Sequence, residues 1–176
     1  KIESNSDIND YVYDFYHGSN QTTPNRLHNK GYISYQKDDI FKYKVHHSAS
    51  KILYSKVLDN EYAKDKKSTY GKLKVVLNYS GGFIGDKYMF LSTDLVGKQM
   101  VGILVDNENI GENIIKTYSS KLFNWYITNE KSSGFNTGIF KLPKLDFTKS
   151  WTDQDLYQYF NLTQEEINLI ENTIKD

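Results

Sequence analysis

The first two thirds of the chain carry apolar residues at alternating positions, a spacing typical of half-buried strands. The segment from Gly31 to Tyr35 shows this alternation, and residues 72–79 form the most apolar stretch before a Ser-Gly-Gly turn. The segment 83–91, which turns at Gly85-Asp86, is the expected partner of residues 72–79. Further predicted strands are residues 40–45 and 100–105. Together these segments predict a mixed, mainly antiparallel β core.

Helical spacing replaces this alternation in the last third of the chain. Apolar side chains recur at helical intervals from Asn113 to Thr128, so we predict one long amphipathic helix there. We predict a C-terminal helical pair at 152–160 and 163–174, because each segment begins with a threonine N-cap and has an acidic residue three positions later. Residues 48–59 are compatible with a helix, and residues 60–70 are interpreted as a Lys-rich loop. Strands followed by helices predict the α+β class.

The chain has the length of one domain with a substantial core. Residues 1–30 are polar and mixed, and we interpret them as a lead-in or linker from a missing N-terminal domain. Residues 31–150 hold the predicted core, and residues 151–176 hold the helical pair, which we expect to pack on that core. No apolar run approaches eighteen residues and no leader is recognisable, so we expect a cytoplasmic protein without membrane contact.

The charged residues are balanced in number but not in position. The chain has 22 basic and 22 acidic residues, whereas a dedicated nucleic-acid binder usually has a basic excess. Residues 37–74 hold ten lysines against five acids, and the stretch from Asp146 onward is acidic. This division favours a one-sided binding face, although a solvated loop explains the lysines equally well. The absence of cysteine excludes disulfides and thiolate metal sites.

The sequence carries no recognisable enzyme motif. Methyl transfer to the amino group of a flipped adenine requires a glycine-rich cofactor turn and an Asn/Asp-Pro-Pro-Tyr/Phe loop, but Pro24 and Pro143 are the chain's two prolines and are not adjacent. Ser80-Gly81-Gly82 leads into another strand-like stretch, whereas a phosphate-binding turn is followed by a helix. We therefore expect no catalytic residue in this chain.

Two short clusters resemble metal-binding patterns in part. Asp38 and Asp39, followed by Lys42, come nearest to the carboxylates of a Mg²⁺ nuclease, yet the start of a strand explains them more simply. His46 and His47 would point to opposite faces of a strand and are unsuited to one ion. We expect no metal site, and a divergent metal-dependent nuclease remains the enzymatic alternative.

The chemistry that remains is DNA contact. Lysine, serine and backbone amides bind phosphates, whereas Asn, Gln, Lys and Ser side chains can also reach base edges. Such residues gather around the predicted strand at 40–45, beside the turn at 80–87, before the strand at 100–105 and after the long helix. The candidate DNA-binding residues are Lys37, Lys42, Lys44, His46, His47, Ser48, Lys51, Ser80, Lys87, Lys98, Gln99, Lys131, Ser132 and Asn136.

Several segments resemble the TaqI-like C-terminal specificity domain of type IIG restriction–modification enzymes, which are adenine-specific DNA methyltransferases. The most specific matches are Ser-Gly-Phe-Asn at 133–136, Leu-Pro-Lys-Leu-Asp at 142–146 and the stretch 151–170. Residues 74–81 and 96–122 also resemble the domain, with Ser119 where the family usually has Asn. The resemblance is good from about residue 70 onward and poor before it.

The resemblance implies a target-recognition domain that grips double-stranded DNA, reads its target in the major groove and helps position an adenine flipped into a separate methyltransferase domain. The cofactor S-adenosylmethionine would bind in that missing catalytic domain, and this chain would hold none. The methyltransferase would be part of the same polypeptide, or a separate protein that this chain serves as a specificity polypeptide in trans. A plain protein-binding domain is the remaining alternative.

Overall fold

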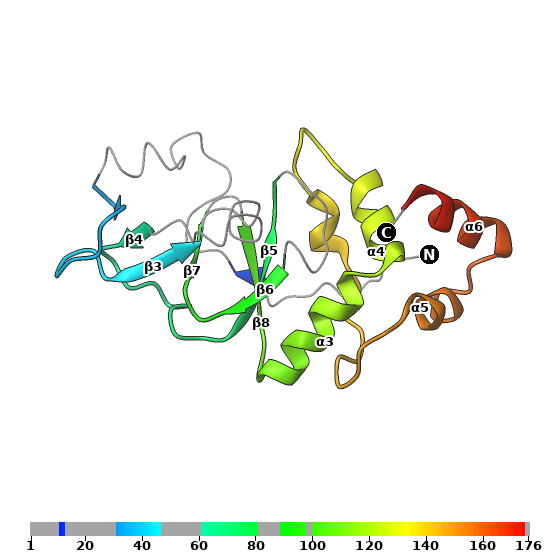
Figure 1. Ribbon diagram of the computed structural model, residues 1–176, viewed down its shortest axis with the longest axis horizontal. Coiled ribbons are helices and arrows are strands. Elements are labelled where there is room, and N and C mark those ends of the chain that lie inside the picture. The colour runs from blue at the N-terminus through cyan, green and yellow to red at the C-terminus, as the bar shows by residue number, and fades with distance from the viewer. Residues whose placement is uncertain (1–10, 13–30, 47–60, 81–88, 98–99, 175–176) are drawn as a thin grey trace.

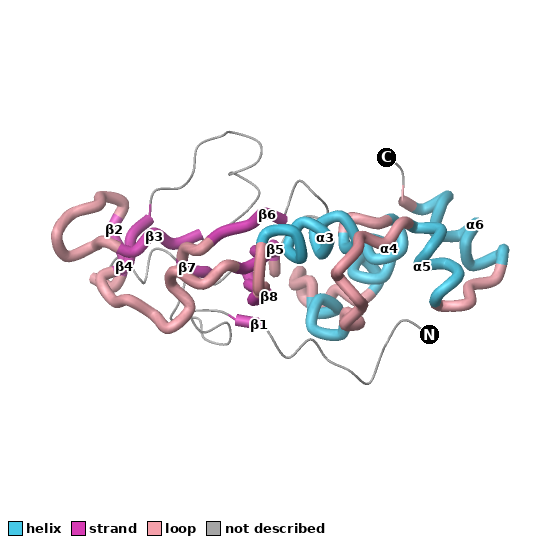
Figure 2. Tube along the Cα trace, turned by 90° about the horizontal axis from the view of Figure 1, so that it is seen from below, coloured by secondary structure: helices cyan, strands magenta, loops and turns pink. Residues whose placement is uncertain are grey.

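The computed structural model describes residues 11–12, 31–46, 61–80, 89–97 and 100–174 of the chain. The protein is elongated, with a small sheet at one end, a second sheet in the middle and helices at the other end (Figures 1 and 2). Each sheet has four strands, and antiparallel pairing predominates. The class is α+β, as the sequence predicted.

The central sheet has the strand order β1-β8-β5-β6 and is antiparallel throughout. Its strands are β1 (Tyr11–Val12), β5 (Lys74–Asn78), β6 (Met89–Ser92) and β8 (Met100–Leu104). Every residue of β5 is buried, because its two faces are covered: Val75 and Leu77 lie in one hydrophobic cluster and Val76 in another. The strand also has a neighbour on each side, β8 and β6. The predictions of β5 and β8 are confirmed, as is the pairing of β5 with residues 89–91 of the predicted partner; residues 83–88 of that partner lie outside the described residues.

The small sheet has the strand order β2-β4-β3-β7, and only the β3–β7 pair is parallel. Its strands are β2 (Ile33–Ser34), β3 (Tyr43–His46), β4 (Glu61–Ala63) and β7 (Leu95–Val96). Ile33, Val45, Ala63 and Leu95 form its separate hydrophobic core. We call residues 31–46 and 61–72, together with β7, the β lobe. The prediction of a loop at 60–70 was wrong at its start, where β4 pairs with β2 and β3.

The two sheets are joined through the chain between β6 and β7. Only Thr93 and Asp94 separate β6, in the central sheet, from β7, in the small sheet. Val76, Val96 and Met100 form a buried cluster at this junction, where Phe90 packs against them. The β lobe is therefore attached to the body of the protein by a covalent link and by packed side chains.

The predicted long helix is two helices, α3 (Glu108–Tyr118) and α4 (Lys121–Asn129). The Ser120 side chain accepts a hydrogen bond from the Phe123 amide and caps α4. The Asp153 carboxylate, from the start of α5, accepts bonds from the first two amides of α4, at 3.1 and 3.0 Å. The prediction of one helix was wrong because a carboxylate distant in the sequence satisfies amides that a continuous helix would satisfy itself.

The C-terminal helical pair, α5 (Asp153–Tyr159) and α6 (Gln164–Thr173), has both predicted capping boxes. Thr152 pairs reciprocally with Asp155, and Thr163 with Glu166. Before the pair, a 3₁₀ helix, η2 (Thr137–Lys141), precedes the segment at Pro143, whose carbonyl accepts a bond from the buried Tyr118 hydroxyl at 3.1 Å. None of the helices in the described part of the chain combines the length and apolar character needed to cross a bilayer.

One large hydrophobic core joins the central sheet to the helices. It contains Val75, Leu77 and Ile103 from the sheet, and aromatic side chains such as Tyr118 and Phe123 from the helices. Leu156, Tyr157, Phe160 and Ile170 carry this core into α5 and α6. The helical pair is therefore packed on the core, whereas the β lobe depends on four buried residues of its own.

Candidate nucleic-acid interface

Lysines crowd the surface of the β lobe. Its described residues contain seven lysines, at positions 37, 42, 44, 64, 66, 67 and 72, against four acids, at positions 38, 39, 61 and 65. Lys37 and Lys42 are exposed and Lys44 is half-buried, so the first three predicted contact residues lie on one small lobe. A concentrated positive surface attracts a polyanion even when the whole chain is neutral.

Asp38 holds the turn that separates Lys37 from Lys42. Its Oδ1 accepts hydrogen bonds from the amides of Ile40 and Phe41 at 2.7 and 2.6 Å, and its own amide donates to the Phe41 carbonyl at 3.2 Å. These bonds give Asp38 a structural role in shaping the turn. Within the described ranges, no three His, Asp or Glu side chains are grouped as metal ligands would be.

Exposed aromatic and aliphatic side chains accompany these lysines. Tyr32, Tyr35 and Ile40 are 43%, 60% and 63% exposed, and the Nζ of Lys64 lies 5.1 Å from the centre of the Tyr32 ring. In the part of the chain that the structure describes, the other exposed large hydrophobic residues are Tyr159 and Leu169, on α5 and α6. Lysines beside exposed rings suit nucleic acid, because phosphates bind the cations and bases stack on the rings.

His46 was predicted to contact DNA, but its side chain is buried and only 4% of the residue is exposed. Its Nε2 lies 3.1 Å from Ser92 Oγ and 3.2 Å from Asp94 Oδ2, and the Phe90 ring packs edge-on against the imidazole. His46, at the end of β3, therefore faces the junction between the sheets and not the surface. The same nitrogen, Nε2, contacts both Ser92 Oγ and Asp94 Oδ2, whereas in a catalytic triad the serine and the aspartate contact different nitrogens of the histidine.

Lys74 completes this junction, and sequence reasoning missed it. The side chain is fully buried within β5, and its Nζ donates to the Asp94 carbonyl at 2.7 Å. Burial raises the pKa of the Asp94 carboxyl, but the hydrogen bond and charge of His46 and the charges of Lys44 and Lys74 lower it more, so the pKa lies below its ordinary value. A lysine directly before the apolar run Val75–Leu77 was the available signal. We call His46, Lys74, Ser92 and Asp94 the polar joint.

A tight turn presents the second group of predicted contact residues. Ser132 and Phe135 exchange two backbone hydrogen bonds at 3.0 and 2.8 Å, around Ser133 and Gly134, which have φ values of 51° and 83°. Two central residues with positive φ are typical of a type I′ turn. We call residues 132–135 the serine turn. Its strand-like bridge to Ser80 places Ser80 beside it.

Asn136, also predicted to contact DNA, is a buried anchor for the serine turn. Its side-chain nitrogen donates to the Asn78 carbonyl at 2.9 Å, and its amide donates to the Tyr79 carbonyl at 2.8 Å. These bonds to Asn78, in β5, and to Tyr79, just after it, hold Asn136 in the interior and away from the surface. Lys131 and Ser132 remain exposed beside it.

The predicted residues therefore form two surface groups in the described part of the chain. Lys37, Lys42 and Lys44 lie on the β lobe, and Ser80, Lys131 and Ser132 lie at the serine turn. The remaining candidates fall outside the described residues; they are His47, Ser48, Lys51, Lys87, Lys98 and Gln99.

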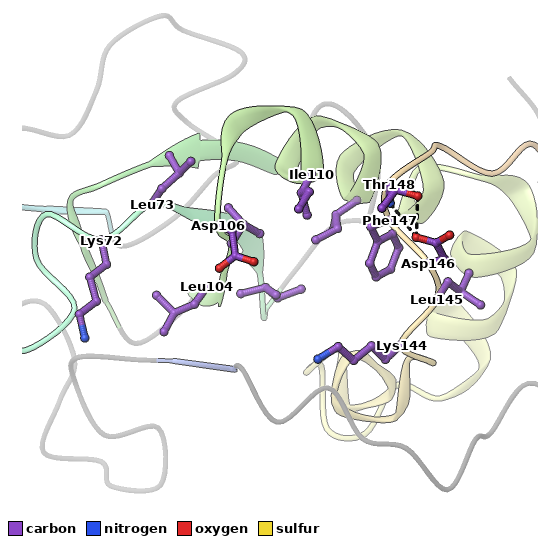
Figure 3. Close-up of a pocket in the computed structure, with 13 residues that line it drawn as sticks. Lys72, Leu73, Leu104, Asp106, Ile110, Lys144, Leu145, Asp146, Phe147 and Thr148 are labelled. Atoms are coloured by element: carbon purple, nitrogen blue, oxygen red, sulfur yellow. Dashed lines mark hydrogen bonds between the residues drawn. The ribbon is translucent and has the colours of Figure 1, made fainter.

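A groove of about 730 Å³ lies between the end of β8, the start of α3 and the segment 144–148 (Figure 3). Its apolar lining includes Ile110, Leu145 and Phe147, while Lys72, Lys144, Asp106 and Asp146 supply charges of both signs. Asp146 accepts bonds from the Thr148 amide and hydroxyl at 3.0 and 2.7 Å, which lower the pKa of its carboxyl. Its mixed charge makes this groove a poorer match for a polyanion than the β lobe. Sequence reasoning did not predict it.

The far end of the protein has the opposite charge from the β lobe. Residues 151–174, which form α5 and α6 with their caps, contain five acids and no lysine, arginine or histidine. The two regions lie at opposite ends of the long axis (Figure 1). The zero net charge of the chain thus conceals an uneven distribution, with an excess of lysines on the β lobe and an excess of acids at the helical end. No family model matches the chain, and no curated protein or solved structure gives a significant match.

Proposed function

We propose that this chain is a DNA target-recognition domain that grips duplex DNA with its β lobe. The observation that carries the proposal is the separation of charge along the molecule: lysines outnumber acids on the β lobe, whereas every charged residue of α5 and α6 is an acid. Phosphate neutralisation supplies most of the affinity of a protein for DNA. The lysines of the β lobe would neutralise phosphates, whereas the acidic helices α5 and α6 would be repelled by them.

The geometry also supports separate roles for the two surface groups, with the lysines of the β lobe binding phosphates and the serine turn reading bases. Flexible lysines such as Lys37 and Lys42 suit phosphates, which carry no sequence information. The serine turn is held by Asn136 and by the Phe135 ring, which stacks on Tyr79 at 5.2 Å. An anchored turn with exposed hydroxyls at Ser132 and Ser133 suits a base edge or a defined phosphate, because little side-chain freedom is lost on binding.

The wider role that we propose is recognition on behalf of an adenine-N6 methyltransferase, in the same polypeptide or in trans, which would bind S-adenosylmethionine and receive the flipped adenine. The resemblance of residues 133–136, 142–146 and 151–170 to the TaqI-like specificity domain motivates this role. The acidic surface of α5 and α6 supports it as well, since a catalytic domain that binds DNA needs basic surface of its own.

Salt-dependent binding tests the grip. The affinity of the full chain for a fluorescent duplex should fall steeply between about 50 and 200 mM salt, with a slope of about −0.9 per phosphate contact. Replacing Lys37 and Lys42 by alanine should weaken binding and flatten the slope by about 2 units. A matched control replaces Lys116, in the last turn of α3, and Lys149, before α5, and so removes the same charge. An equal loss in both double variants, or no salt-dependent affinity, would overturn the proposal.

Selection from a pool of randomised duplexes tests recognition. We expect enrichment of one short sequence that contains an adenine, and we expect Ser132→Ala to relax the preference more than it lowers the affinity for random DNA. Lys42→Ala should do the reverse and weaken every duplex to a similar extent. Recovery of an unchanged pool would leave a DNA grip without target recognition and would contradict this part of the proposal.

A further inference from the structure

A hydrogen-bonded turn of the β lobe carries an exposed isoleucine. Ile40 is 63% exposed, more than any other large hydrophobic residue among those described. Its amide and that of Phe41 donate to Asp38 Oδ1, and the amide of Lys42 donates to the Ala63 carbonyl of β4 at 3.1 Å. Hydrogen bonds thus hold the backbone on both sides of Ile40, and its apolar side chain is exposed to solvent.

The charges close to this turn in the sequence indicate which partner Ile40 meets. Lys37 and Lys42 are exposed and lie within three residues of Ile40 on either side in the sequence. The negative charge of Asp38 is engaged by two backbone amides, whereas Asp39 is exposed and would oppose the approach of phosphate. An apolar projection between cations fits a duplex, in which phosphate strands flank stacked, apolar base pairs.

We infer that Ile40 is a wedge that enters between base pairs when the β lobe binds duplex DNA. This inference rests on the proposed DNA grip and adds the way in which the lobe deforms its target. Proteins that bend DNA insert isoleucine, leucine or phenylalanine between base steps and partly unstack them. The two lysines would hold the backbone on either side, and Tyr35, 60% exposed, would cover apolar surface that the unstacked step uncovers.

Insertion of Ile40 between base pairs can be detected by binding measurements without knowledge of the target sequence. Unstacking a paired step costs a few kcal/mol, but a mismatch has already lost part of that stacking and pairing. A protein that inserts a side chain therefore binds a mismatched duplex more tightly than a fully paired one. A protein that only contacts phosphates binds both duplexes alike, because their charges are identical.

The test compares the affinity of the full chain for two duplexes that differ by one central mismatch. We expect the wild-type chain to prefer the mismatched duplex by about tenfold. Ile40→Ala should reduce that ratio to about one, and Ile40→Leu should keep most of it. The matched control is Leu169→Ala, which removes a side chain that is 55% exposed on α6, and it should leave the ratio unchanged. The Lys37→Ala/Lys42→Ala variant should weaken both duplexes equally.

The outcomes separate the wedge from the grip. A wild-type ratio of about one, or a ratio that survives Ile40→Ala, would overturn the wedge and leave the grip standing. Absence of salt-dependent binding to either duplex would overturn both. Because Ile40 is exposed, Ile40→Ala should unfold at the same urea concentration as the wild-type chain, so a lost preference would report on DNA rather than on folding.

Discussion

The β lobe and the helical end, residues 151–174, differ in the side chains that they bury and in the charges that they expose. The helical end buries Leu156, Phe160 and Ile170 in the large core and shows acids to solvent. The β lobe has a core of four buried residues and shows lysines, tyrosines and an isoleucine. The difference teaches that the two ends contribute unequally to stability, because most of the buried apolar side chains lie in the large core of the body. The lysine-rich surface lies on the lobe with the smaller core.

The polar joint lies between the β lobe and the body of the protein. Lys74 belongs to the central sheet, His46 to the small sheet and Asp94 to the link between them. A buried lysine and histidine need hydrogen-bonded, charged partners, and Asp94 supplies both its carbonyl and its carboxylate. The joint therefore makes the position of the β lobe depend on charge as well as on packing.

The largest expected effect lies in the body of the protein. Phe123→Ala removes a fully buried ring from the large core and should lower the free energy of unfolding by about 3–5 kcal/mol. Urea unfolding followed by circular dichroism measures it. A loss below that of Leu95→Ala would contradict the view that stability resides mainly in the body.

A cavity in the β lobe should cost less and act locally. Leu95→Ala, in β7, should lower the free energy of unfolding by about 2–3 kcal/mol, near the lower end of the range for such changes, because few neighbours are buried around it. Amide exchange should quicken in β2, β3 and β4 well before α4 or α6 is affected. Equal acceleration in both ends would mean that the protein unfolds as one unit.

The charge of Asp94 at the polar joint should make a pH-dependent contribution to the free energy of unfolding. Asp94→Asn keeps the backbone bond to Lys74 but removes the carboxylate charge beside His46, and should cost about 1.5–2 kcal/mol near neutral pH. The folded-state pKa of Asp94 is lowered, so its contribution is complete above the unfolded pKa of about 3.9 and is lost as pH falls through the lower, folded value. The stability gap between wild type and variant should therefore close below about pH 4. A gap that stayed constant into strong acid would contradict the assignment.

The smallest effect is expected at the helical end. Thr163→Ala removes the capping box of α6 and should lower the free energy of unfolding by about 1 kcal/mol. DNA affinity should not change, because α6 lies at the end opposite the β lobe (Figure 1). A comparable loss of DNA affinity would show that the helical end takes part in binding.

The sequence predicted those features that depend only on residues close together in the chain. The apolar run of β5 and the capping boxes at Thr152 and Thr163 are local patterns, and both are present. The break between α3 and α4 could not be read locally, because Asp153 caps α4 from more than thirty residues away. The short strands β4 and β7 were missed for a related reason: two or three residues pair only because their neighbours lie alongside.

The candidate interface was predicted in part for the same physical reason. Lysine density at Lys37 and Lys42 marks a basic surface wherever the chain folds, since exposed lysine is the common case. Burial of His46 and Asn136 depends on groups from other strands, namely Asp94 and the carbonyl of Asn78, so residue type alone could not reveal it. Ile40 attracts attention only once its exposure is known.

Amide hydrogen exchange of the full chain, with and without duplex DNA at low salt, tests the central claim most directly. We expect slower exchange in residues 31–46 and 61–72 when DNA is present, with no change in α5 and α6. Protection confined to α5 and α6, or none in the β lobe under conditions where DNA is bound, would contradict it.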